Sequence, residues 1–527
     1  MDETRPLAER TRARRRLARS TAIVSLATAL SRALGLVREM VTAYYFGVRG
    51  PINAFTVAFQ IPNLVRIVIS DAALSAAFVP VFSELLERGE RERAWRVAST
   101  VLWLLLLVLA GVTALFILIA PLVVPTVIGE YDELAVTLSQ ILFPIVVLLG
   151  VSGIVVAILN SYEHFTVPAL TPVAWNLVII AGLAIGVPRV DSADSQLYVY
   201  AGAIVLGTIV QVLLPIPWLR GRDGRLRVLV DWRDPAVRRV FLLMLPVTLS
   251  LGLINLNQVI GTFVAARWID PTIAPTAIDK AFRLYMLPQG MFSVAIATVL
   301  FPALARLAAR ADFDGFARTV GLGLRQIAFL LVPASVASAV LAEPIVRLIY
   351  ERGEFDADQT PVVAAALAAF SLGLTFNGVM LLLNRAFFGL QLPRVPTLVA
   401  GGNLVLNTAL YAVFHRLGPW GVPLAISIAN VAATAALLWM LRRRIGSVEL
   451  RETAAATGRI TAAALLAGGV FYGVWLPLDG VLGRDVWGEL ISVGSALVSG
   501  AAAYLALCRA LGVRELQALL SLRRRGG

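Results

Sequence analysis

The feature that most constrains this chain is a series of long apolar runs separated by short segments rich in charge, Gly and Pro. Residues 97–128, for example, contain no charged side chain. A helix needs about 20 apolar residues to cross a bilayer. The chain is 58% hydrophobic and 15% charged, whereas soluble domains carry about 25% charged residues. We therefore expect an all-α polytopic membrane protein.

The apolar runs divide into fourteen expected transmembrane helices. They are residues 21–46, 54–83, 97–128, 134–160, 169–188, 197–219, 239–268, 281–305, 319–349, 361–388, 395–415, 420–441, 458–477 and 487–508.

The charges between the runs predict the orientation of the chain. Arginine clusters occur at 88–96, 220–239, 442–444 and 523–525, whereas the loops at 129–133 and 351–358 are rich in acidic residues. Placing the N-terminus in the cytoplasm puts every cluster there, as the positive-inside rule requires. Both termini are therefore expected to be cytoplasmic. The same rule accounts for the formal charge of +13 without a nucleic-acid partner.

Two pairs of segments indicate an internal repeat. Residues 160–176 resemble 384–403 in their order of Asn, aromatic residues and Pro, and 77–82 resemble 299–304. Both offsets correspond to six helices, which predicts two lobes related by a pseudo-twofold axis. The expected parts are a basic N-terminus (1–20), an N-lobe (21–220), a linker (221–238), a C-lobe (239–445), and two further helices with a basic tail (446–527).

The first two expected helices contain charged side chains, namely Arg32, Arg38, Glu39, Arg66 and Asp71. A charge at the centre of a bilayer costs about 2.5–3.5 kcal/mol even on the mildest scale, and such residues usually face a polar cavity. Positions seven apart lie on nearly the same face of a helix. We therefore expect that Arg32 pairs with Glu39 and that Arg38 is left free.

Arg283 and Lys280 occupy the start of the eighth expected helix. Arginine holds phosphate and carboxylate oxygens through two parallel hydrogen bonds and keeps its charge. The charged residues of the first two expected helices, together with Arg283, therefore predict an anion site that includes Arg66 and Arg283. Alternatives stay open, because Arg32 and Glu39 could form a purely structural ion pair, and Arg66 and Arg283 could extend to the membrane interface.

The sequence lacks the signatures of the common enzymes. It has two histidines, one cysteine (Cys508) and neither a phosphate-binding GxxxxGK[ST] loop nor an HExxH motif. We expect no catalytic residues, no metal site and no cofactor. The remaining expectation is a carrier driven by an ion gradient, by the membrane potential or by the gradient of its substrate.

The segments SRALGLVRE and YFGVRGPINAFTVAFQIPNLVRIVISDAALSAAFVPVFSEL, together with AFRLYMLPQGMFSVAIATVLFPALARL, resemble the lipid II flippase family MurJ (MviN). This resemblance covers essentially the whole chain. It implies a member of the multidrug/oligosaccharidyl-lipid/polysaccharide exporter superfamily that moves undecaprenyl-pyrophosphate-linked peptidoglycan precursor to the outer leaflet of the bacterial cytoplasmic membrane. Lipid II, membrane lipids and other cell-wall synthesis proteins are the implied partners.

The resemblance also implies roles for individual residues. Arg32, Arg38, Arg66 and Arg283 match the family's cavity arginines, and Glu39 matches a position that is usually Asp. Some family members resemble sodium-coupled carriers; here Asn403 and Val422 match that site, whereas Gly261, Asn407 and Ile426 replace two Asp and a Thr. Because hard cations favour charged oxygen ligands, we expect no sodium coupling.

Four alternative functions remain. A flippase for another polyprenyl-pyrophosphate glycan would use the same residue types. A multidrug or cation antiporter would need an excess of buried carboxylates, whereas the excess here is basic. A polyprenyl-phosphate-processing enzyme would need clustered Asp or His at a membrane face, and a passive scaffold would not need charges within its spans.

Overall fold

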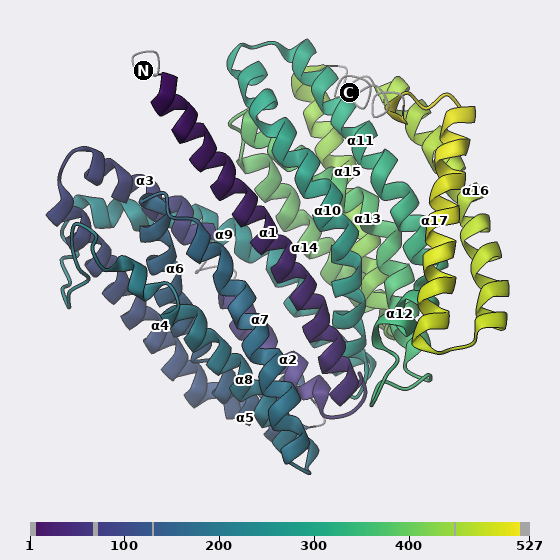
Figure 1. The fold of residues 1–527 in the computed structure, drawn as a ribbon, viewed down its shortest axis with the longest axis horizontal. Coiled ribbons are helices and arrows are strands. Elements are labelled where there is room, and N and C mark those ends of the chain that lie inside the picture. The colour runs from purple at the N-terminus through teal and green to yellow at the C-terminus, as the bar shows by residue number, and fades with distance from the viewer. Residues whose placement is uncertain (1–6, 67–71, 129–130, 447–449, 517–527) are drawn as a thin grey trace. The chain divides into compact units, whose positions relative to one another are not determined.

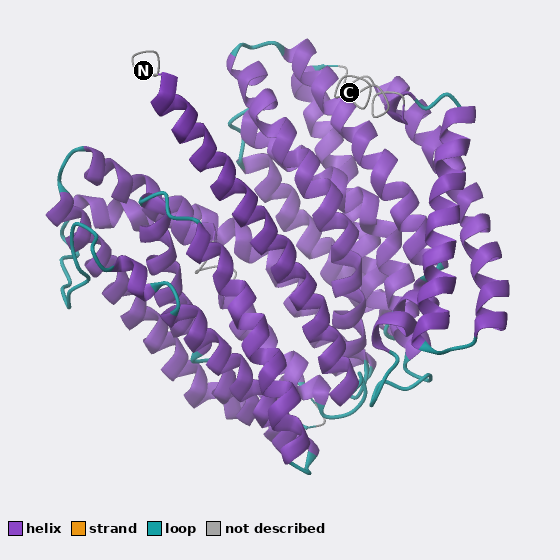
Figure 2. Ribbon diagram, viewed as in Figure 1, coloured by secondary structure: helices purple, strands orange, loops and turns teal. Residues whose placement is uncertain are grey.

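The computed structural model describes residues 7–66, 72–128, 131–446 and 450–516, and in these residues helices alternate with short loops and no strand occurs (Figures 1 and 2). This result follows from the apolar runs. A helix pairs its backbone N–H and C=O groups internally, which is required where no water is present. The expectation of an all-α membrane protein is confirmed.

The first half of the chain contains nine α-helices among the described residues, and the longest connection lies between the last two. The nine are α1 (Leu7–Phe46), α2 (Ile52–Arg66), α3 (Ala72–Glu87), α4 (Arg91–Val127), α5 (Asp132–Leu142), α6 (Ile145–Ser161), α7 (Thr166–Gly186), α8 (Ala193–Leu213) and α9 (Pro235–Val264). The second half contains α10 (Ala274–Ala309), α11 (Phe313–Val340), α12 (Ala342–Tyr350), α13 (Thr360–Gly389), α14 (Arg394–Phe414), α15 (Gly421–Ile445), α16 (Leu450–Leu482) and α17 (Val486–Ala510).

Eleven spans among the described residues are helical, long and apolar enough to cross a membrane. Three of the fourteen expected spans, 21–46, 54–83 and 239–268, are not among these eleven. The first corresponds to the charged helix α1 and the third to α9, whereas the second is divided between α2 and α3 around residues 67–71, which lie outside the described residues. The count of fourteen therefore stays a prediction.

Two expected spans contain a break that the sequence analysis did not predict. Residues 134–160 are divided into α5 and α6 at Phe143–Pro144, and residues 319–349 into α11 and α12 at Leu341. Proline lacks a backbone N–H and therefore removes one hydrogen bond from a helix interior, but it is tolerated at a helix start. Pro144 is the N-cap of α6, and Pro344 lies in the first turn of α12.

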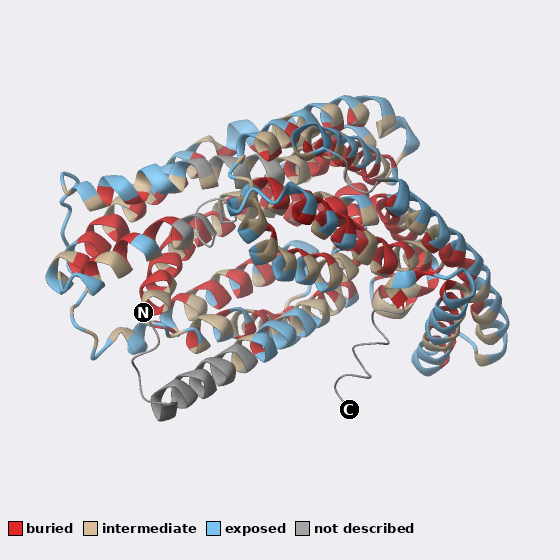
Figure 3. Ribbon diagram, turned by 90° about the horizontal axis from the view of Figure 1, so that it is seen from above, coloured by how far each residue is buried: buried red, intermediate tan, exposed pale blue. Residues whose placement is uncertain are grey.

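The chain forms two compact units, one of residues 1–46 and 50–259 and the other of residues 47–49 and 260–527. In the first unit, buried side chains of α3, α4, α6 and the start of α9 form a hydrophobic core around Phe78, Phe82 and Trp95. In Figure 3 such buried residues alternate with exposed ones along the helices. A helix that faces lipid on one side and protein on the other has this pattern.

In the second unit, α13 packs against α10, α11 and α15. The last two helices, α16 and α17, lie side by side and pack against α11 (Figure 1). Their shared core contains Phe471, Tyr504 and Cys508. Gly500 permits this close approach, because a side chain at this position would clash with the ring of Phe471.

Candidate anion site

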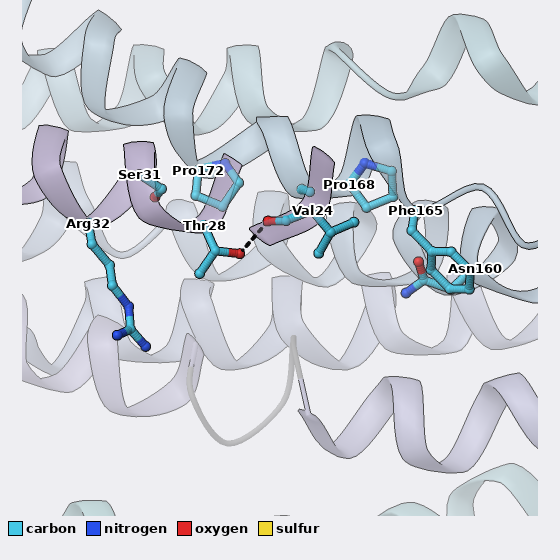
Figure 4. Close-up of a pocket in the computed structure, with 9 residues that line it drawn as sticks. Val24, Thr28, Ser31, Arg32, Asn160, Phe165, Pro168 and Pro172 are labelled. Atoms are coloured by element: carbon cyan, nitrogen blue, oxygen red, sulfur yellow. Dashed lines mark hydrogen bonds between the residues drawn. The ribbon is translucent and has the colours of Figure 1, made fainter. Parts of the chain in front are cut away.

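A cavity of about 440 Å³ lies between α1 and the region where α6 turns into α7. Figure 4 shows Arg32 at one end of the row of lining residues and Asn160 and Phe165 at the other. Ser31 and Thr28 also line it, but Thr28 donates its hydroxyl to the Val24 carbonyl within α1. The guanidinium is therefore the main group with which this cavity could bind an anion.

Arg32 is available for such a ligand. Within the part of the chain that the structure describes, its side chain is exposed and has no hydrogen-bond or ion-pair partner. A guanidinium carries five N–H donors in a fixed planar arrangement. These donors need water or an anion as acceptors, so the geometry favours ligand binding over a purely structural ion pair.

The expected pairing of Arg32 with Glu39 is not the pairing that the structure shows. The Nη2 atom of Arg38 donates to Glu39 Oε1 at 2.6 Å, and both side chains are about nine-tenths buried. Arg38 is therefore not free, which corrects the sequence prediction. Seven residues correspond to about 10 Å along a helix. The Arg32 side chain lies in the cavity instead, and the adjacent Arg38 is close enough to neutralise the buried carboxylate.

Helix α7 completes the environment of Arg38. Asn176 Oδ1 accepts a hydrogen bond from Arg38 Nη1 at 3.1 Å, and the guanidinium lies 4.8 Å from the centre of the Trp175 ring. Asn176 Nδ2 donates to the carbonyls of Pro172 and Ser31 at 2.9 and 3.4 Å. The sequence analysis did not select Asn176 or Trp175 as site residues. An amide within an apolar run was the available signal, because such amides often form hydrogen bonds between helices.

Among the three described charged residues of this part of α1, positive charge exceeds negative charge. Arg32 and Arg38 carry two positive charges, and Glu39 carries one negative charge. Burial makes the pair sensitive to its surroundings, because the energy of a charge interaction rises as water is removed. An anion that enters near Arg32 would therefore also attract Arg38 and repel Glu39.

Arg66 cannot be placed with these residues. It is the last residue of α2, but its side chain lies outside the described part of the structure, as does Asp71. The proposed role of Arg66 in the anion site stays a prediction.

Arg283 belongs to the second unit and forms an ion pair. Its Nε donates to Asp279 Oδ2 at 2.9 Å and its Nη2 to Asp279 Oδ1 at 3.3 Å, and both residues lie on α10. Asp279 was not predicted as a partner, although opposite charges four residues apart on a helix commonly meet. The guanidinium remains about one third exposed. Nearby, the Lys280 side chain is fully buried and lies 5.5 Å from the Tyr350 ring.

The five positions that the sequence analysis compared with a sodium site hold two amides, Asn403 and Asn407, and no carboxylate. Asn407 Nδ2 donates to Asn403 Oδ1 at 2.7 Å, and Asn403 Nδ2 donates to the Ala429 carbonyl at 3.1 Å. A side chain added at Gly261 would meet Val422 and the Tyr411 hydroxyl at 3.2 and 3.3 Å. The space that a carboxylate at position 261 would need is therefore occupied by these two side chains. No group of three or more His, Cys, Asp or Glu residues suited to a metal occurs among the described residues.

Comparison with known proteins decides the family. A family model described as Lipid II flippase MurJ matches residues 42–479. The chain belongs to the MurJ family.

Curated members of this family are similar over most of their length. The lipid II flippase MurJ of Burkholderia cenocepacia is 31% identical over 439 residues, which cover 81% of this chain and 84% of the relative. The probable lipid II flippase MurJ of Vibrio cholerae is 31% identical over 523 residues, with coverage of 95% and 97%. The matched region includes the Arg283–Asp279 pair on α10.

Solved structures support the fold. A structure described as lipid II flippase MurJ in an inward closed conformation has a TM-score of 0.75 and 24% identity, and the match covers 93% of this chain and 99% of that one. An inward-facing multidrug resistance MATE transporter of the MOP superfamily has a TM-score of 0.66, 17% identity and coverage of 80% and 95%. These likenesses show that the chain has the fold shared by MurJ and MATE transporters.

Proposed function

We propose that this protein moves lipid II, the undecaprenyl-pyrophosphate-linked peptidoglycan precursor, from the inner to the outer leaflet of the bacterial cytoplasmic membrane by alternating access. The proposal is supported by membership of the MurJ family. It depends above all on one observation, the partnerless guanidinium of Arg32 in a cavity beside a transmembrane helix. The protein acts as a carrier and catalyses no chemical reaction.

The pyrophosphate binds Arg32 first and then competes with Glu39 for Arg38. Two phosphate groups can accept several hydrogen bonds from guanidinium groups at once. Because the Arg38–Glu39 pair is largely buried, exchange of its partner changes the charge balance inside the bundle. Arg66 and Arg283 complete the anion site in our proposal, and release of Arg283 from Asp279 is the corresponding step in the second unit.

The finer architecture belongs to the same proposal. Fourteen membrane crossings form two six-helix lobes with pseudo-twofold symmetry, at 21–220 and 239–445, joined by the linker 221–238 and preceded by the N-terminal segment 1–20. Residues 446–527 contribute two more helices beside the polyprenyl tail. Both termini lie in the cytoplasm. Other cell-wall synthesis proteins supply the substrate and use it.

A binding measurement tests the site. Purified protein in detergent would be titrated with lipid II, undecaprenyl phosphate and a neutral lipid, and the Arg32→Gln variant would be compared with Arg310→Gln. Arg310 is an exposed arginine at the end of α10. We expect Arg32→Gln to weaken lipid II binding about tenfold, which corresponds to about 1.4 kcal/mol, and Arg310→Gln to leave it unchanged. Equal affinities for the three lipids would contradict the assignment.

A further inference from the structure

Hydrogen bonds hold the segment between the 3₁₀ turn at Ile216–Leu219 and α9 against the side of α4. We refer to residues 225–233 as the strap. Arg227 N–H donates to Ser99 Oγ at 3.0 Å, and the Arg227 carbonyl accepts from Trp103 Nε1 at 3.0 Å. Asp231 N–H donates to Thr100 Oγ1 at 3.1 Å. These bonds fix the backbone of the strap at two positions along its length.

Ion pairs hold the chain on either side of the strap. Arg91 Nη1 lies 2.9 Å from Asp223 Oδ1, and Arg93 donates to both carboxylate oxygens of Asp234 at 3.1 Å. Within the strap, Leu226 packs against the hydrophobic core of the first unit. The strap therefore has a defined inner face and a defined outer face.

The strap lies where α4 changes from charged to apolar. Ser99 and Trp103 are eight and twelve residues beyond the start of α4 at Arg91, which corresponds to about 12 and 18 Å along the helix axis. The first turns of α4 contain charged residues, whereas 97–127 is uncharged. In a membrane-spanning helix this change marks the boundary between water and bilayer.

The outer face of the strap combines exposed apolar side chains with arginines. Val228 is 82% exposed and Trp232 is 67% exposed. Arg225, Arg227 and Arg233 are also exposed, and the Arg233 guanidinium lies 5.7 Å from the centre of the Trp232 ring. With Asp231 as the single acidic residue, three arginines leave the strap with a charge of +2. Tryptophan is enriched at membrane interfaces, and clustered arginines attract anionic headgroups.

We propose that the strap is a membrane-binding surface that takes anionic phospholipid. Val228 and Trp232 enter the boundary between headgroups and acyl chains, and the three arginines contact lipid phosphates. A lipid surface satisfies both kinds of side chain at once, whereas a soluble anion would leave Val228 and Trp232 in water. Because α4 and the start of α9 are tied to the strap, this contact fixes their depth in the bilayer.

Spin-label depth measurements test the proposal. A nitroxide would be attached at Val228→Cys in full-length protein reconstituted into vesicles with 30% anionic lipid. The only native cysteine, Cys508, is buried, so unmodified protein gives the background. Collision rates would be measured with oxygen, which concentrates in lipid, and with a water-soluble nickel chelate. Glu87→Cys, at the exposed end of α3, and Leu118→Cys, 75% exposed on the apolar part of α4, give the water and lipid references.

We expect the oxygen-to-nickel collision ratio at Val228 to exceed that at Glu87 at least threefold and to lie below that at Leu118. A ratio equal to that at Glu87 would overturn the proposal, because it would place the strap in water. Protection of the Val228 label from both reagents would also overturn it, because it would indicate cover by protein.

The anionic preference is tested separately. Arg225→Gln, Arg227→Gln and Arg233→Gln would be combined, and a matched variant would carry Arg310→Gln, Arg318→Gln and Arg416→Gln, three exposed arginines of the second unit. We expect the strap substitutions, or replacement of anionic by zwitterionic lipid, to lower the collision ratio at Val228 about twofold or more. Val228 ratios that are the same in all these conditions would refute the role of the arginines. Monodisperse elution of each variant would show that it is folded.

Discussion

Arg38 is held by groups from two helices, although its own neighbour provides the countercharge. Glu39 neutralises it, Asn176 accepts a second hydrogen bond, and Trp175 covers the guanidinium. A buried ion pair contributes little net stability unless its remaining hydrogen bonds are satisfied. These contacts satisfy both terminal nitrogens of Arg38, whereas its buried Nε has no hydrogen-bond partner among the described residues.

Replacing Glu39 tests that competition. In Glu39→Gln the carboxylate no longer competes with pyrophosphate for Arg38, so we expect affinity for inorganic pyrophosphate or lipid II to rise about three- to tenfold, measured by calorimetry. We expect transport to slow, because the bound anion is released less easily. Glu133→Gln, at an exposed position in the first turn of α5, serves as control. Weaker binding by a folded Glu39→Gln protein would argue against the competition.

Asn176 tests whether α7 positions Arg38. Asn176→Ala removes the acceptor 3.1 Å from Arg38 Nη1, and loss of a hydrogen bond to a charged group typically costs about 1.5–3 kcal/mol. We expect the affinity for lipid II to fall and the midpoint of thermal unfolding to decrease. Asn176→Asp would place a second carboxylate beside Arg38 and is expected to weaken anion binding further. Unchanged binding in both variants would show that α7 has no role in the site.

At the scale of elements, the end of the α16–α17 pair is joined to α12 by buried charges. Arg347 is 3% exposed and forms ion pairs with Asp479 and with Glu489, the latter at 2.8 Å. Removal of one partner from a buried ion cluster leaves uncompensated charge and costs about 3–5 kcal/mol. We expect Arg347→Gln to lower the unfolding midpoint in detergent sharply.

An exposed ion pair at the other end of the same helices provides the control for Arg347. Arg514 and Glu452 form a 3.0 Å pair with side chains 81% and 50% exposed, and such pairs contribute about 0–1 kcal/mol. We expect Arg514→Gln to change the unfolding midpoint little. Equal losses in Arg347→Gln and Arg514→Gln would show that burial does not determine the contribution of these charges.

The stability that Asp234 contributes at the junction between the strap and α9 should depend on pH. The Arg93 guanidinium and the Ala236 N–H hold the pKa of Asp234 below its ordinary value of 3.8. The folded state thus binds a proton at Asp234 less readily than the unfolded state does. The contribution of Asp234 to the free energy of unfolding is therefore fully present above pH 3.8 and is lost as pH falls through the lower pKa of the folded state. We expect Asp234→Asn to flatten the acid limb of thermal unfolding, and Asp231→Asn to leave it unchanged.

At the scale of the whole molecule, the apolar runs were sufficient to predict an all-helical membrane protein, because their length and lack of charge leave few other structures. The breaks at Phe143–Pro144 and Leu341 were not predicted. Periodicity does not distinguish a continuous helix from two short helices in line. Pro144 and Pro344 lie at these breaks, but proline alone does not locate them, because Pro333 lies inside the continuous helix α11.

The candidate site was predictable by residue type but not by pairing. The sequence identified charged positions within apolar runs, and the structure places Arg32 in a cavity. It pairs Glu39 with Arg38 rather than with Arg32, and Arg283 with Asp279. Helical spacing gives the face on which a residue lies, whereas the choice of partner depends on neighbouring helices such as α7, which no spacing within α1 reveals.

The most direct test of the proposed function is transport of lipid II in vesicles. Reconstituted protein would be supplied with labelled lipid II in one leaflet, and its appearance in the other would be followed with a membrane-impermeant reagent. We predict transport by the unmodified protein and by Arg310→Gln, and a loss of at least tenfold in Arg32→Gln. Transport by Arg32→Gln at the unmodified rate would contradict the assigned site. Absence of lipid II movement with the folded, unmodified protein would contradict the function itself.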